Sequence, residues 1–175
     1  MKVDEVAPNV ETDAWLPGAQ FADAFRIVVA GATLDARQAA QRMMGRSPRW
    51  VERLVALRNA LVAPFGLKTS GAGEKAAKDI IGIFPVLSET PNRLVAGFDD
   101  SHLDFRVVVD VSASDHGQQV TATTLVRTNN RLGRLYLAVI LPFHRLVVRA
   151  LLRQVAGWPT IGAFHAHDPP SARSQ

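Results

Sequence analysis

The sequence predicts an α+β domain in which a curved antiparallel sheet of about five strands wraps around one long C-terminal helix. Residues 103–111 alternate between apolar and polar side chains, which is typical of a strand with one covered face. Strand-like segments between residues 80 and 130 are joined by short turns, so neighbouring strands run antiparallel. Residues 131–156 have apolar side chains at helical spacing and would cover one face. The predicted order is β-α-α-β-β-β-β-α.

The first three elements lie between residues 21 and 63. Residues 21–31 predict a strand that ends at Gly31, and one of its faces carries Phe21, Asp23, Phe25, Ile27 and Val29. Thr33 or Asp35 would cap a helix over residues 34–44. Ser47-Pro48 begins a second helix, whose apolar stripe includes Trp50.

Four consecutive strands are predicted at residues 80–90, 93–100, 102–113 and 118–130. Pro85 lacks a backbone donor, which favours an edge or a bulge in the first of them. The compact connection at residues 115–117 predicts a hairpin between the third and the fourth.

The C-terminal helix is predicted over residues 131–156, with a kink at Pro142 because proline removes one backbone hydrogen bond. Its wide apolar stripe is expected to face the sheet and consists of Leu132, Leu135, Tyr136, Val139, Ile140, Phe143, Val147, Ala150 and Leu151. A second apolar line, expected on the back of the helix, consists of Leu137, Leu141, Val148 and Leu152. This back line predicts either a wider sheet or a partner, for which a homodimer and a membrane surface are the alternatives.

The totals fit one globular domain. Apolar residues make up 47% of the chain and charged residues 21%, and there is no cysteine, which excludes disulfides and thiolate metal sites. We expect a flexible lead-in over residues 1–20, a single domain over 21–156 and a flexible tail over 157–175. The N-terminus lacks the pattern of a signal peptide and no uninterrupted apolar run reaches membrane-spanning length, so we expect a cytoplasmic protein without a membrane span.

The formal net charge is +4, and arginines cluster in the C-terminal third of the chain. Aromatic residues do not interleave with these arginines, as a groove for nucleic-acid strands would require. We therefore interpret the positive charge as a solvated surface and expect no nucleic-acid partner.

Three segments carry a family resemblance: "WVERLVALRNALVAPFGLK", "IGIFPVLSETPNRLVAGFDDSHLDFRVVV" and "NRLGRLYLAVILPFHRLVVRALLR". They resemble the bacterial domain-of-unknown-function family 2867, and the element order is similar to the helix-grip architecture of the START-like, birch-pollen-allergen-like (SRPBCC) superfamily. The resemblance implies a helix-grip fold, a bacterial context and association with oxidoreductase domains. It implies no catalytic residue.

A curved sheet around a helix would leave an apolar cavity with few polar contacts, which is typical of a ligand site. The side chains expected to line it are Trp50, Phe84, Phe98, Phe105, Tyr136, Ile140, Phe143 and His144. Met43 and Met44 would supply an adaptable wall or fill gaps. The sequence therefore predicts a domain that binds a small apolar, lipid-like or polyketide-like ligand without a cofactor.

His102, Asp104 and Arg106 are two residues apart on one predicted strand and would stand in a row. If the row faces the cavity, an aspartate held between histidine and arginine could orient a general base for acid–base chemistry on a carbonyl ligand. If it faces solvent, the charges pair across strands on the convex side of the sheet. The sequence leaves both alternatives open. His144 with Tyr136 is the other acid–base candidate.

His165, His167 and Asp168 alternate in the tail, where a metal site is not expected. The function classes that remain are a ligand-binding domain, an enzyme using the same cavity, and a homodimerising accessory module for an oxidoreductase.

Overall fold

The computed structural model describes residues 2–45, 48–53, 56 and 79–157. Within them, seven antiparallel strands form one open sheet in the order β1-β2-β7-β6-β5-β4-β3. The strands are β1 Asp4–Val6, β2 Phe21–Val29, β3 Ile80–Ile81, β4 Phe84–Thr90, β5 Arg93–Asp99, β6 Leu103–Ser114 and β7 Gly117–Thr128. The helices are α1 Thr12–Trp15, α2 Ala36–Met44 and α4 Arg131–Gly157, and residues 49–53 are also helical. The α+β class, the antiparallel sheet and the C-terminal helix are thus confirmed.

The sheet has two more strands than the five expected, and both additions are short edge strands. β1 comes from the segment assigned to a flexible lead-in, and it pairs with β2 through Asp4 opposite Arg26. β3 is cut from the predicted strand over residues 80–90 by a turn at Gly82, whose φ of +63° suits glycine. Strands of two or three residues show no detectable alternation, which is why the sequence did not reveal them.

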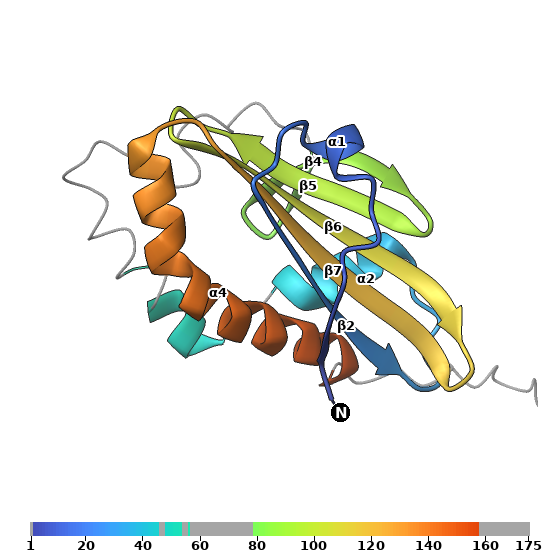
Figure 1. The fold of residues 1–175 in the computed structure, drawn as a ribbon. Helices are drawn as coiled ribbons and strands as arrows, with labels where there is room; N and C mark the ends of the chain where they lie inside the picture. Colours follow the sequence, from blue (N-terminus) through green and yellow to red (C-terminus); the bar gives the residue numbers. More distant parts are fainter. Residues whose placement is uncertain (1, 46–47, 54–55, 57–78, 158–175) are drawn as a thin grey trace, which may run out of the picture.

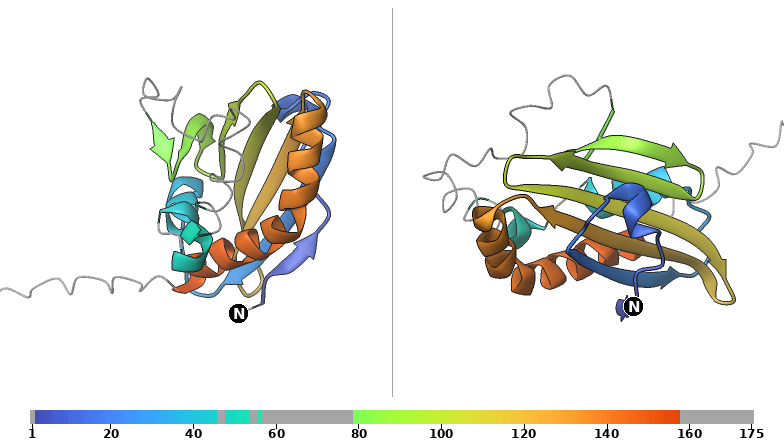
Figure 2. Two further views of the ribbon diagram at one scale, coloured as in Figure 1. Left: turned by 90° about the vertical axis from the view of Figure 1, so that its left-hand side faces the viewer. Right: turned by 45° about the horizontal axis from the view of Figure 1, so that its top comes forward.

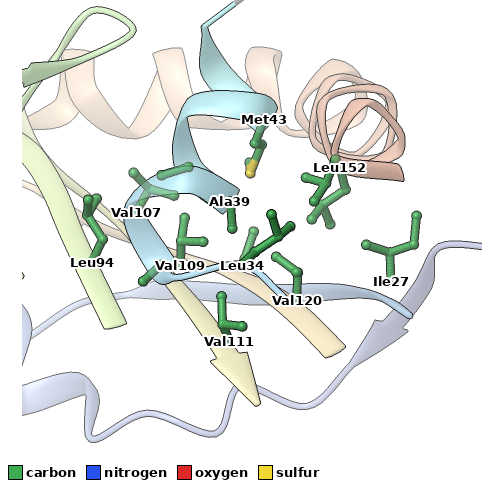
Figure 3. Close-up of a cluster of buried hydrophobic side chains, with 14 of the residues drawn as sticks. Ile27, Leu34, Ala39, Met43, Leu94, Val107, Val109, Val111, Val120 and Leu152 are labelled. Atoms are coloured by element: carbon green, nitrogen blue, oxygen red, sulfur yellow. The ribbon is translucent and has the colours of Figure 1, made fainter. Parts of the chain in front are cut away.

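Helix α2 covers the β3–β6 side of one sheet face. The Asp35 carboxylate accepts a hydrogen bond from the Gln38 N–H at 2.7 Å and the Gln38 side chain accepts one from the Asp35 N–H at 3.3 Å, so a capping box starts the helix. Figure 3 shows Ala39 and Met43 pointing from α2 onto Val107 and Val109 of β6. Figure 2 shows that α2 and α4 lie on the same side of the sheet.

Helix α4 packs on α2, β2 and β7 and changes direction along its length (Figure 1), with Pro142 inside it. Its C-terminal half places Val148, Leu152 and Val155 in the core. In its N-terminal half, Gly133 is the one buried residue. The two halves of α4 therefore have different environments.

The opposite face of the sheet is covered by the N-terminal segment, which crosses it in Figure 1. Gln20 donates its N–H to the carbonyl of Val126 at 3.0 Å, and Leu16 is 2% exposed. Val108 and Leu125, which point away from the helices, are also buried. The part of the N-terminal segment that follows β1 thus adds a second, smaller packed layer to the sheet.

Candidate functional site

Three phenyl rings from neighbouring strands form a cluster on the helix-bearing face. Phe84 of β4, Phe98 of β5 and Phe105 of β6 have ring centroids 5.1–6.0 Å apart. Alternation along β6 puts Phe105 on the same face as the core residue Val107. All three side chains are only half-buried, because α2 covers the other end of these strands and α4 lies over β2 and β7. The cluster is an apolar wall that the described helices leave incompletely covered.

The other predicted ligand residues divide into two groups. Tyr136, Ile140 and His144 are half-buried along the N-terminal half of α4. Trp50 is 42% and Phe143 46% exposed. Met43 is buried in the core and Met44 is partly buried against it, so both fill space between α2 and the sheet.

The half-buried His144 forms a pair with a buried aspartate of β2. Its Nε2 lies 3.2 Å from Oδ1 of Asp23, which is 6% exposed, and the Phe21 ring stands edge-on to the imidazole with centroids 6.0 Å apart. Asp23 Oδ2 has no hydrogen-bond partner in the structure. A carboxylate in this position fixes the orientation of the imidazole. Asp23 was not selected from the sequence, although an aspartate on the apolar face of a predicted strand was the signal that could have identified it.

His102 is packed against the N-terminus of α4. Its side chain is 2% exposed, its ring stands edge-on to Tyr136 with centroids 5.8 Å apart, and its Nδ1 lies 3.4 Å from Oδ2 of Asp100. Neither ring nitrogen has a hydrogen bond in the structure. The His102 carbonyl accepts the Asn129 N–H at 2.9 Å, and a Cβ at Gly133 would lie 1.9 Å from that carbonyl oxygen. The close approach at Gly133 therefore fixes how the first turn of α4 packs against the backbone before β6.

The predicted row of His102, Asp104 and Arg106 is not one array. β6 begins at Leu103, so His102 lies in the preceding turn and contacts the helix, whereas Asp104 points to the opposite face. The expectation that a row on the convex side would be solvated is wrong for Asp104, which is 2% exposed. The N-terminal segment causes the burial of Asp104, because the Arg127 side chain that pairs with Asp104 also donates to the Pro17 carbonyl at 3.2 Å.

Asp104 is held by several donors. Arg127 Nη2 lies 2.6 Å and Nε 2.9 Å from its Oδ2, while the Asn129 amide donates to Oδ1 at 3.1 Å and the Asp100 N–H donates to Oδ1 at 3.2 Å. Such a fully bonded buried carboxylate is typical of a structural role.

Arg106 folds across β5. Its Nη1 donates to the carbonyls of Phe98 at 3.0 Å and Phe105 at 2.9 Å and lies 2.7 Å from Asp99 Oδ1. Gly97 makes room for it, since a Cβ there would lie 2.9 Å from Arg106 Cδ. These bonds tie Arg106 to the end of β5 and away from His102.

The faces of α4 differ from the prediction. Val148 and Leu152, assigned to the back of the helix, are 6% and 0% exposed and belong to the core. Leu135 and Val139, assigned to the sheet-facing stripe, are 64% and 53% exposed. The kinked helix has apolar side chains on more than one face, so spacing alone could not determine its orientation. A homodimer stays a prediction, but it cannot use Val148 or Leu152.

A hollow of about 310 Å³ lies on another flank of α4. It is lined by Gln20, Thr128, Arg134, Leu137, Ala138 and Leu141, none of which was predicted as a ligand residue. Leu137 and Leu141 of the predicted back line are therefore half-exposed at its wall.

Among the described residues, no group of three or more His, Asp or Glu side chains is arranged to hold a metal ion. The His165, His167 and Asp168 motif lies outside the described residues, as do residues 158–175 of the predicted tail. By length and composition, α4 is apolar enough to cross a bilayer, although its last turns are packed in the core of the domain.

These features define a mixed α+β domain: an open antiparallel sheet, covered on one face by a capped helix and a long C-terminal helix. A family model described as "Protein of unknown function (DUF2867)" matches residues 15–151, and the chain belongs to this family. No curated protein and no solved structure matched the chain significantly.

Proposed function

We propose that the protein binds a small, mainly apolar ligand on the helix-bearing face of the sheet, against Phe84, Phe98 and Phe105. The observation that carries the proposal is the half-burial of three neighbouring phenyl rings at the end of the sheet that α2 does not cover. Covering one such ring contributes roughly 1.5–3 kcal/mol, so a ligand spanning the cluster gains affinity without any new charge pair.

Two polar side chains of α4 suit a ligand with one hydrogen-bonding group. His144, fixed by Asp23 at 3.2 Å, and Tyr136 are half-buried on the helix that borders the same face. An apolar wall with a few oriented polar side chains is the usual composition of a small-molecule site. Lipid-like and polyketide-like molecules have this chemistry.

The finer classification belongs to the same proposal. A sheet covered by a long C-terminal helix supports a helix-grip domain of the START-like superfamily. We place it in a bacterial cytoplasm, where it would act alone or as an accessory module of an oxidoreductase. Fold analogy supports this context and assigns no chemistry.

The experiment is a fluorescence titration with the apolar probe N-phenylnaphthylamine, followed by competition with saturated fatty acids of increasing length. We expect the probe to bind and Phe98→Ala to weaken it about tenfold, because one covered ring is lost. Leu87→Ala is the matched control: Leu87 is also an apolar strand residue, but it is 51% exposed and lies outside the cluster. Equal probe affinity in the two variants, or no saturable binding, would contradict the proposal.

A second function, acid–base catalysis on a bound carbonyl compound, is favoured by the Asp23–His144 pair. An imidazole oriented by a buried carboxylate can exchange a proton with a ligand. The measurement is the rate of α-proton exchange on a bound ketone in the unmodified protein, in His144→Gln and in Asp23→Asn. If His144→Gln exchanges the proton as fast as the unmodified protein, the imidazole is not the acid–base group and the catalytic proposal fails.

A further inference from the structure

The outward face of α4 carries apolar side chains that the fold does not use. Leu135, Val139 and Leu146 are 64%, 53% and 59% exposed. With about 3.6 residues per turn, they fall within roughly 40° of one another around the helix axis. The core residues Val148, Leu152 and Val155 are centred roughly 150° away. These three exposed side chains, here called the outward strip, thus point away from the domain.

The helix that bears the strip is strongly basic. Residues 131–157 contain Arg131, Arg134, Arg145, Arg149 and Arg153 and no acidic residue. Glu5 of β1 lies 3.7 Å from Arg145 and 3.2 Å from Arg149 and is shared by the two. For Arg131, Arg134 and Arg153, no carboxylate within the described ranges lies at ion-pair distance. The face therefore combines an apolar strip with a net positive charge.

We propose that the outward strip docks on the surface of an anionic lipid bilayer, with Arg131 and Arg153 at the level of the headgroups. An apolar helix face bordered by arginines is the composition of helices that lie in the membrane interface. Anionic headgroups neutralise the arginines, and the strip enters the boundary with the acyl chains. The long arginine side chains reach the headgroups while their apolar stems lie along the helix.

Charge favours a lipid surface over a second copy of the chain. Two α4 helices packed strip to strip would bring arginines together without a carboxylate on either helix to offset them. A bilayer surface presents phosphates and acidic headgroups instead. The C-terminal half of α4 stays anchored by Leu152 in the core, so docking requires no unfolding of the domain.

The test is co-sedimentation of the full chain with vesicles of phosphatidylcholine alone and of phosphatidylcholine mixed with phosphatidylglycerol. We expect binding only to the mixed vesicles, and release at about 1 M salt, where the screening length falls to roughly 3 Å. Arg131→Gln should lower the partition coefficient about fivefold, the effect of one basic side chain at an anionic surface. The double variant Leu135→Gln/Leu146→Gln should lower it at least about tenfold.

Leu87→Gln is the control for the double variant, since it changes another exposed apolar side chain, on β4, and should leave vesicle binding unchanged. Circular dichroism checks that all variants fold, and sedimentation velocity records their oligomeric state. Equal binding to both vesicle types, no binding, or a dimer that the double variant dissociates would overturn the proposal. Phe98→Ala should bind vesicles normally, so this result is independent of the ligand proposed above.

Discussion

Replacing Gly133 by alanine tests where α4 begins on the sheet. Alanine in place of glycine inside a helix normally stabilises by roughly 0.5–1 kcal/mol. Here the new Cβ would lie 1.9 Å from the His102 carbonyl oxygen and 2.9 Å from its carbon. The clash is with backbone, so the helix or the turn before β6 must move by more than an ångström. We therefore expect Gly133→Ala to destabilise the protein instead of stabilising it.

The magnitude follows from what that movement breaks. The His102 carbonyl accepts the Asn129 N–H at 2.9 Å, and the His102 ring packs edge-on against Tyr136. Overpacking costs typically about 1–3 kcal/mol, and an unpaired buried polar group costs about as much. When the two costs are added and the propensity gain is subtracted, Gly133→Ala should lower the free energy of unfolding by about 1–5 kcal/mol.

The assay is denaturant unfolding followed by circular dichroism, with Gly157→Ala as the matched control. Gly157 is the last residue of the same helix, and a Cβ there would meet nothing within 4 Å. We expect Gly157→Ala to be neutral or slightly stabilising. If Gly133→Ala also stabilises, the close approach between α4 and His102 does not exist, and the position of the N-terminal half of α4 is wrong.

Two further predictions concern packing and charge. Leu152→Ala should lower the free energy of unfolding by about 2–5 kcal/mol, because Leu152 is 0% exposed. Leu146→Ala should change it by less than about 0.5 kcal/mol, because Leu146 is 59% exposed. Equal losses of the two variants in denaturant unfolding would refute the orientation of α4. Hydrogen bonds from Arg37 lower the pKa of Asp79 and of Glu89 below their ordinary values of 3.8 and 4.5. The ion pairs of Arg37 with these two carboxylates therefore stabilise the folded state at neutral pH, and this contribution is lost when the carboxylates are protonated at acidic pH. The melting temperatures of the unmodified protein and Arg37→Ala should therefore converge as the pH falls below about 4.5; a constant difference down to pH ~2 would show that these charges do not contribute.

The sequence predicted the central strands well because their signals are local. Alternation over β6 and β7 and the compact turn between them define a hairpin without knowledge of the rest of the chain. The start of α4 was also predicted, since a helix must begin between the last strand and the apolar stripe. β1 was missed because a three-residue strand forms only when β2 offers it an edge.

The orientation of side chains depended on tertiary contacts that the sequence does not display. The parity of β6 was correct for Val107 and Val109, which are in the core. It failed for the polar row, because Asp104 is buried by a segment almost ninety residues earlier in the chain. His102 lies before the strand begins, where period two does not apply.

The sequence indicated some residues of the candidate site and missed others, because some of its contacts form only through tertiary packing. Phe84, Phe98 and Phe105 were selected as aromatic residues on covered strand faces, and the register of the sheet brings them together. The partner of His144 was not foreseen, because Asp23 lies far from it in sequence and only the packing of α4 on β2 joins them.

One face of helix α4 is buried in the core and stabilises the fold, whereas the opposite face is exposed and contributes little to folding. Burial of Val148, Leu152 and Val155 contributes several kcal/mol and holds the C-terminal half on the sheet. Leu135 and Leu146 remain in water, so they contribute little to that balance, and a helix with glutamine at both positions would fold equally well. Folding therefore explains one face of α4 and leaves the other unexplained. A lipid surface explains the remaining face, since it gives both the exposed leucines and the unpaired arginines a partner.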